Sequence, residues 1–142
     1  NLIFTSSKKA GILDFQDALI GPIGLDLASL FKDLYYEWSE EKIYNWYKTY
    51  ISKIKKKLGL ELSLELLVKF IDFASIQRQI RILGKLSQVY QQLNREERIK
   101  DFPRLINYLI ETSSRYVELE NLSLAISSLR DPLEKKMNKI FS

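Results

Sequence analysis

The apolar residues of this chain follow two different periods. Near the N-terminus, residues 2 to 5 and 11 to 14 contain short apolar runs separated by a turn of small and basic residues. Two such runs around a turn predict a β-hairpin. From Leu25 onwards, apolar residues recur at spacings of three and four, which indicates an amphipathic helix. The apolar positions of this first predicted helix are Leu27, Leu30, Phe31, Leu34 and Tyr35.

Start and stop signals divide the middle of the chain into two more helices. Ser39 is followed by two acidic residues, which suits a helix N-terminus, and this helix is predicted to end at Leu58, after three lysines and just before Gly59. Ser63 is predicted to cap the next helix, which runs to about Leu93. Its apolar residues cover much of its circumference, and such a helix usually lies at the centre of its bundle.

The C-terminal part is also predicted to be helical. After a polar connector over residues 94–98, Asp101 and Pro103 mark a helix start, and the apolar pattern continues to Val117. Residues 118–129 form another helical run, and Asp131 and Pro132 begin a short basic helix that reaches residue 140. The pattern therefore predicts a single, mainly α domain over residues 1–142, with a short β-hairpin and about five or six helices.

Composition narrows the possible classes of protein. A chain of 142 residues can bury one core, and 46% apolar with 28% charged residues is ordinary for a globular protein. It has no cysteine and no histidine, so disulfides, thiolate metal sites and the commonest general base are excluded. No apolar run approaches the roughly 20 residues that a membrane helix needs. With no recognisable signal peptide either, the protein is expected to be cytoplasmic, without a membrane partner.

The net charge of +4 raises the question of a polyanionic partner. The lysines gather in two places, over residues 53–57 and 135–139. Solvated helix faces explain both clusters better than a nucleic-acid site does, so a nucleic-acid partner is not expected. A basic nucleic-acid-binding domain would require the two clusters to share one face, and its affinity would fall steeply with salt.

Carboxylates stand at a strand end near the N-terminus. The apolar run at Ile12 and Leu13 ends in Asp14, and Asp17 follows three residues later. Two carboxylates around one turn can hold a hard cation such as Mg²⁺, which prefers oxygen ligands. The simpler interpretation is a surface turn with two solvated acids. The hairpin is expected to bring Asn1 close to Asp14, and an amide and a carboxylate so placed resemble the metal-holding pair of kinases.

Three stretches carry a resemblance to a known family. They are Asn1-Leu2-Ile3-Phe4, Gly11-Ile12-Leu13-Asp14-Phe15-Gln16-Asp17-Ala18 and Gly21-Pro22-Ile23-Gly24-Leu25-Asp26-Leu27-Ala28. Together they resemble the C-terminal lobe of aminoglycoside-phosphotransferase-like kinases. The sequences around residues 31–38 and 76–84 are in addition similar to bacterial cell-wall sugar kinases, which phosphorylate N-acetylmuramate and N-acetylglucosamine at the anomeric hydroxyl. The resemblance is sharp over residues 1–38 and weaker over 70–90.

The resemblance implies an ATP-dependent phosphotransferase that uses Mg²⁺. Asp14 would be the main bridging ligand, and Asn1 would complete the coordination of a second ion. Asp17 would either support the water shell of the metal or touch the substrate, and both roles stay open. Asp26 is implied to brace the catalytic loop, although a plain helix cap explains it equally well.

The family's remaining catalytic parts would precede Asn1. They are the general base, an Asp five residues before the Asn, together with the phosphate-covering loop, the phosphate-binding Lys and the adenine hinge. The chain is therefore expected to be the C-terminal lobe of a kinase, truncated inside its catalytic loop, lacking its N-terminal lobe and inactive alone.

The acceptor would be a small molecule bound by this lobe. The residues predicted to contact it are Asp33, Tyr36, Trp38, Gln77, Arg78 and Arg81. A Trp face suits a sugar ring, while Arg and Asp suit hydroxyls or a carboxylate. The long polar side chains at residues 77–81 could equally face water beside neighbouring helices. An aminoglycoside or choline is an alternative acceptor, and a non-catalytic helical binding module with a coincidental hairpin motif is an alternative function.

Overall fold

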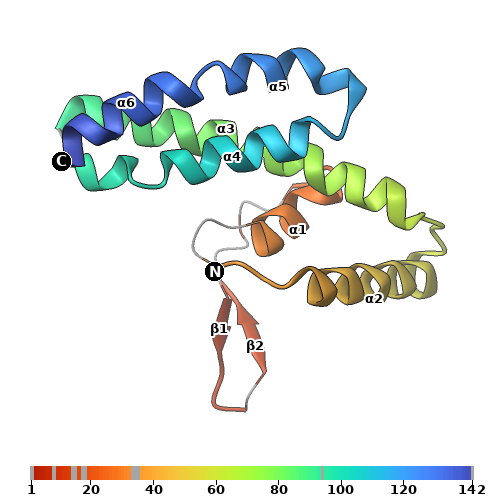
Figure 1. Cartoon of the computed structure of the whole chain (residues 1–142). Helices are drawn as coiled ribbons and strands as arrows, with labels where there is room; N and C mark the ends of the chain where they lie inside the picture. Colours follow the sequence, from red (N-terminus) through yellow and green to blue (C-terminus); the bar gives the residue numbers. More distant parts are fainter. Residues whose placement is uncertain are drawn as a thin grey trace.

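The structure is a computed structural model that describes residues 2–7, 9–13, 16, 19–32, 36–93 and 95–141 (Figure 1). In chain order its elements are β1 (Leu2–Phe4), β2 (Ala10–Ile12), α1 (Gly24–Phe31), α2 (Glu40–Leu58), α3 (Leu64–Leu93), the 3₁₀ helix η1 (Glu96–Ile99), α4 (Phe102–Ser113), the 3₁₀ helix η2 (Val117–Leu119), α5 (Glu120–Ser127) and α6 (Arg130–Phe141). The predicted mainly α fold with a short hairpin is therefore confirmed.

The two strands form the predicted antiparallel hairpin, which projects from the helical part of the molecule (Figure 1). Leu2 pairs with Ile12, and Phe4 pairs with Ala10 next to the turn. The turn is closed by Thr5, whose backbone N–H donates to the Lys9 carbonyl at 3.0 Å and whose hydroxyl donates to the same carbonyl at 2.9 Å. The pairing of Leu2 with Ile12 places the open ends of the strands side by side.

Helix α3 is the central helix, as its wide apolar surface predicts. Its N-terminal half packs against α1 and α2, and its C-terminal half packs against α4 (Figure 1). Two apolar cores result. The first contains Leu27, Ala28, Tyr47, Leu67, Ile71 and Ala74, and the second contains Ile76, Ile106, Leu109 and Ile126. The leucine and alanine of the Asp-Leu-Ala motif thus belong to the first core.

Helix α1 approaches α3 closely at its first residue. Gly24 is buried there, and a Cβ atom added to it would lie 2.6 Å from the carbonyl carbon of Phe70 and 2.9 Å from the backbone nitrogen of Ile71. Real Cβ atoms do not approach other atoms at such distances. The contact between α1 and the backbone of α3 therefore depends on a glycine at this position.

Most of the predicted helix ends are confirmed. The Ser63 hydroxyl accepts the Leu66 N–H at 3.1 Å at the start of α3. Gly59 ends α2 with a φ of 66°, and its N–H donates to the Lys55 carbonyl at 3.0 Å. Ser39 and Asp101 occupy the predicted N-cap positions of α2 and α4, but neither side chain forms a capping hydrogen bond.

Two predicted helices extend beyond the helix ends of the structure. The helix expected to continue to Val117 ends at Ser113, and Tyr116 has extended backbone angles. Its ring packs edge-on against Phe73 of α3, with 5.1 Å between ring centroids, so its place in the apolar pattern reflects contact with α3 rather than a longer α4. Helix α1 ends at Phe31, and the predicted stripe residues Leu34 and Tyr35 lie outside the described residues.

The lysine clusters do not share a face. The end of α2, which carries residues 53–57, and α6, which carries residues 135–139, lie on opposite sides of the view in Figure 1. The shared basic face that a nucleic-acid site would require is therefore not formed by these two clusters. None of the helices in the described ranges is both long and apolar enough to cross a lipid bilayer.

Candidate functional site

The predicted metal ligands Asn1, Asp14 and Asp17 lie outside the described residues, as does Asp33 of the predicted acceptor site. The described part of the hairpin still bears on the metal prediction, because the paired residues Leu2 and Ile12 are one and two residues from Asn1 and Asp14 in the sequence. Elsewhere, the described ranges contain no group of three Asp, Glu, His or Cys residues placed to hold a metal ion. Placement of Mg²⁺ at residues 1, 14 and 17 stays a prediction.

Four of the predicted site residues line one cavity of about 400 Å³ between α1 and α3, here called the α1–α3 cavity. Asp26 lies on its α1 side, and Gln77, Arg78 and Arg81 lie on its α3 side. The sequence left open whether these polar α3 residues line a pocket or face water, and in the structure they line a cavity. Arg78 and Arg81, with Lys85 nearby, make this cavity basic, and the Arg78 Nε atom is buried without a hydrogen-bond partner.

Asp26 does not cap α1. The N-cap residue is Ile23, no side chain caps this end, and Asp26 is exposed in the first turn of the helix. The helix begins at Gly24, one residue before the apolar pattern, which places Asp26 inside the first turn, so the carboxylate acts on the positive helix end only through its charge. The carboxylate also acts at a distance on Tyr50, whose phenol pKa is raised by burial and by Asp26. The bracing role of Asp26 stays a prediction.

Tyr36 and Trp38 line a different cavity, of about 520 Å³, here called the aromatic cavity. Its lining comes from the end of α1, from the segment between α1 and α2, and from helices α2, α3 and α4. Its polar and charged lining residues include Lys32, Glu37, Glu40, Gln79, Arg104, Asn107, Tyr108, Glu111 and, just after α4, Arg115. The Tyr36 and Trp38 rings lie 4.2 Å apart between centroids. The Trp38 indole N–H donates to the Leu30 carbonyl at 3.2 Å, and its ring packs edge-on against Trp46, so its orientation is fixed.

Helical periodicity explains why neighbouring residues of α3 border different cavities. Residues three or four apart lie on the same face of a helix. Gln77, Arg78 and Arg81 therefore share the α3 face that borders the α1–α3 cavity, while Gln79 lies on another face and borders the aromatic cavity. Gln79 is only 4% exposed, and its Oε1 atom has no hydrogen-bond partner. A buried amide oxygen at a cavity wall offers an acceptor to a ligand donor.

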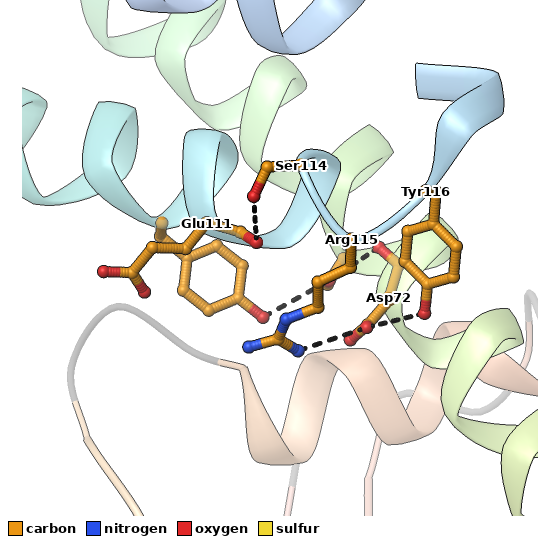
Figure 2. Close-up of polar contacts among 7 residues, drawn as sticks. Asp72, Glu111, Ser114, Arg115 and Tyr116 are labelled. Atoms are coloured by element: carbon orange, nitrogen blue, oxygen red, sulfur yellow. Dashed lines mark hydrogen bonds and ion pairs between the residues drawn. The ribbon is translucent and has the colours of Figure 1, made fainter. Parts of the chain in front are cut away.

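A buried carboxylate contacts Arg115, one of the residues that line the aromatic cavity (Figure 2). Asp72 of α3 is 2% exposed, and its Oδ2 atom accepts a hydrogen bond from the Tyr116 hydroxyl at 2.8 Å. The Arg115 Nη1 atom lies 3.4 Å from the same oxygen, which makes an ion pair. Burial, followed by the hydrogen bond to Asp72, raises the pKa of the Tyr116 phenol. The tyrosine therefore stays protonated and donates to the carboxylate.

Asp72, Gln79 and Arg115 are not among the residues predicted from the sequence. One signal for Asp72 was present, because an acid inside the apolar run from Phe70 to Ala74 must find a partner if the run is buried. The partners themselves lie 43 and 44 residues further along the chain. No local pattern connects Arg115 with Asp72.

Comparison with known proteins gives two findings. A family model described as the phosphotransferase enzyme family matches residues 1–52. A curated N-acetylmuramate/N-acetylglucosamine kinase of Neisseria meningitidis serogroup B is 33% identical over 123 residues, which cover 86% of this chain and 36% of that protein. A protein of the same name from Pseudomonas putida is 26% identical, with 90% of this chain and 38% of the relative covered.

A third such kinase, from Pseudomonas aeruginosa, is 29% identical, with 89% of this chain and 38% of the relative covered. The chain thus spans little more than a third of the length of the curated relatives it matches. No solved structure matches the chain significantly. The resemblance drawn from the sequence motifs is confirmed: the chain is similar to the phosphotransferase enzyme family over its first 52 residues and to N-acetylmuramate/N-acetylglucosamine kinases over most of its length.

Proposed function

We propose that this chain supplies the metal-binding and acceptor-binding part of an ATP-dependent phosphotransferase that phosphorylates the anomeric hydroxyl of a cell-wall amino sugar. The observation that carries the proposal is the similarity, over 86–90% of the chain, to three kinases named for N-acetylmuramate and N-acetylglucosamine. The rest of the catalytic machinery, including the general base, would lie in a preceding segment. A cytoplasmic location is part of the same proposal, because ATP is the phosphoryl donor.

The proposed metal site rests on the hairpin and on ligand chemistry. The Leu2–Ile12 pairing supports a site at the open end of the hairpin, where Asn1, Asp14 and Asp17 offer an amide oxygen and two carboxylates. Hard oxygen donors of this kind fit Mg²⁺. When bound together with ATP, Mg²⁺ would neutralise charge on the phosphates. Asp14 would hold the ion through its carboxylate, Asn1 would add a neutral oxygen, and Asp17 would orient metal-bound water or the acceptor.

We propose the aromatic cavity as the acceptor site. Tyr36 and Trp38 present ring surface to a sugar, and the fixed Trp38 ring reduces the entropy lost on binding. Gln79 and Asn107 offer amide groups to an N-acetyl group or to hydroxyls. The α1–α3 cavity is the second candidate, and the buried Arg78 Nε atom without a partner is the observation that favours it.

The test of the proposed function uses the full-length gene product with Mg²⁺-ATP. N-acetylmuramate and N-acetylglucosamine are offered beside choline and an aminoglycoside, and formation of the sugar 1-phosphate is measured by phosphorus NMR. We expect phosphorylation of the amino sugars and no turnover by residues 1–142 alone. Turnover of choline or the aminoglycoside without turnover of the amino sugars would contradict the proposed substrate. ATP turnover by the isolated chain would contradict the assignment as one part of a larger catalytic unit.

A kinetic comparison distinguishes the two candidate cavities. Tyr36→Ala in the full-length protein is expected to raise the KM for the sugar about fivefold without changing the KM for ATP, since a ring contact contributes on the order of 1 kcal/mol. Tyr44→Ala is the matched control, because Tyr44 is similarly exposed but does not line the aromatic cavity. Arg78→Ala and Arg81→Ala are expected to have the smaller effect. The reverse order would assign the acceptor to the α1–α3 cavity.

A further inference from the structure

The two sugars in the names of the relatives differ by one charge. N-acetylmuramate carries a lactyl carboxylate that N-acetylglucosamine lacks. A protein that acts on either sugar must therefore accommodate this carboxylate without depending on it. If the aromatic cavity holds the sugar, as proposed above, one group in its lining should recognise an anion.

Arg115 has the geometry for this role. Its side chain is 53% exposed and borders the aromatic cavity, while its Nη1 atom is held at 3.4 Å by the buried Asp72 carboxylate. A guanidinium carries five N–H donors. Within the described ranges, Asp72 is the one hydrogen-bond acceptor found for the Arg115 guanidinium, so its other N–H donors are available to a ligand. Figure 2 shows the guanidinium of Arg115, which follows the end of α4, with one end paired to the Asp72 carboxylate.

The other cations of the cavity are placed differently. Arg104 forms an ion pair with Glu37 at 3.6 Å, and Lys32 lies over the Tyr108 ring, 5.4 Å from its centroid. Glu40 and Glu111 also line the cavity, so it has no strong net positive charge. Recognition of an anion there would depend on local, directed donors, and a planar guanidinium provides two parallel N–H groups that match a carboxylate.

The buried Asp72 makes Arg115 a positioned group. Asp72 is itself held by the Tyr116 hydroxyl at 2.8 Å, and the Tyr116 ring is packed against Phe73. The carboxylate is therefore fixed in place, and it restrains one end of the guanidinium. A restrained donor loses less conformational entropy on binding than a freely rotating one.

We propose that Arg115, positioned by Asp72, determines the preference of the enzyme for the carboxylated sugar over the neutral one. This inference rests on the proposed function. Arg115 would contact the lactyl carboxylate, whereas Asp72 would act only through Arg115. The common parts of the two sugars would be bound by the rest of the cavity and would not depend on this pair.

The test measures kcat/KM of the full-length protein for N-acetylmuramate, N-acetylglucosamine and the amide of N-acetylmuramate, in which the carboxylate is replaced by a neutral group. Arg115→Gln is expected to lower kcat/KM for N-acetylmuramate about 10- to 100-fold, the range for a lost charged hydrogen bond. The value for N-acetylglucosamine should change less than about threefold. Arg115→Lys should keep part of the preference, because it keeps the charge but not the paired donors.

Two further variants separate a positioning role from a structural one. Asp72→Asn keeps an acceptor for Tyr116 but loses the charge that positions Arg115. We therefore expect the ratio of kcat/KM for N-acetylmuramate to that for N-acetylglucosamine to fall less than in Arg115→Gln. Arg95→Gln removes a positive charge from an exposed residue that does not line the cavity and should leave the ratio unchanged. Equal losses for both sugars in Arg115→Gln would overturn the inference.

The amide substrate tests the inference on the wild-type protein alone, so the test does not require that any variant folds. The wild type is expected to prefer N-acetylmuramate to its amide. Equal use of both by the wild type would overturn the inference even while sugar phosphorylation stands. If the wild type phosphorylates neither sugar, the proposed function fails and this inference fails with it. The two failures are therefore distinguishable.

Discussion

Asp14→Asn in the full-length protein is expected to lower kcat by about three orders of magnitude or more, in line with the loss of a main electrostatic contribution to phosphoryl transfer. An asparagine keeps the size of the side chain but loses the negative charge that would hold the metal at the phosphates. The described hairpin supports this position for the ligand, because the Leu2–Ile12 pairing fixes the strand end that precedes it. The fold should be retained, which far-UV circular dichroism would check.

Companion variants make the metal prediction sharper. Asn1→Ala should lower kcat less than Asp14→Asn does, since a neutral oxygen contributes less than a carboxylate to holding a cation. Asp17→Asn separates the two roles left open for that residue. A higher requirement for Mg²⁺ would indicate the water shell of the metal, and a higher KM for the sugar would indicate contact with the acceptor. Full activity in Asp14→Asn would overturn the kinase assignment.

Local chemistry accounts for the parts of the fold that the sequence predicts well. The ends of α2 and α3 depend on Gly59 and Ser63, and each forms its hydrogen bond with a residue three or four positions away. Contacts between residues this close in the chain can be predicted from a short window of sequence. Ser39 shows the limit of such rules, because it stands at the N-cap position without using its side chain.

Distant contacts account for what the sequence does not predict. The apolar pattern continues from α4 through Tyr116, but the chain leaves the helix at Ser113 and Tyr116 instead reaches Asp72, 44 residues earlier. The same contact places Arg115 at the aromatic cavity. Periodicity could have separated Gln79 from Arg78 and Arg81 on α3, but it could not show that α4 would cover one face and α1 another. The sequence therefore indicated several residues that line cavities, but not which of them line the same cavity.

The second large expected effect concerns the contact between α1 and α3. Gly24→Ala should lower the free energy of unfolding of the full-length protein by about 3 kcal/mol, the upper part of the usual range for overpacking. The new methyl group would meet the Phe70 carbonyl group and the Ile71 nitrogen, with the nearest carbon at 2.6 Å. These are backbone atoms inside a helix, so no side-chain rotation can relieve the clash, and α1 must move off α3. Leu27 and Ala28, buried in the first core, would move with it.

Gly84→Ala is the matched control, because it makes the same chemical change inside a helix with the opposite surroundings. Gly84 lies in α3, and a Cβ atom there would meet nothing within 4 Å. Alanine favours a helix over glycine by roughly 0.5–1 kcal/mol, so this variant should be slightly more stable than the wild type. Thermal and urea unfolding of both variants give the comparison. A Gly24→Ala protein as stable as Gly84→Ala would show that α1 does not approach α3 as closely as the structure places it.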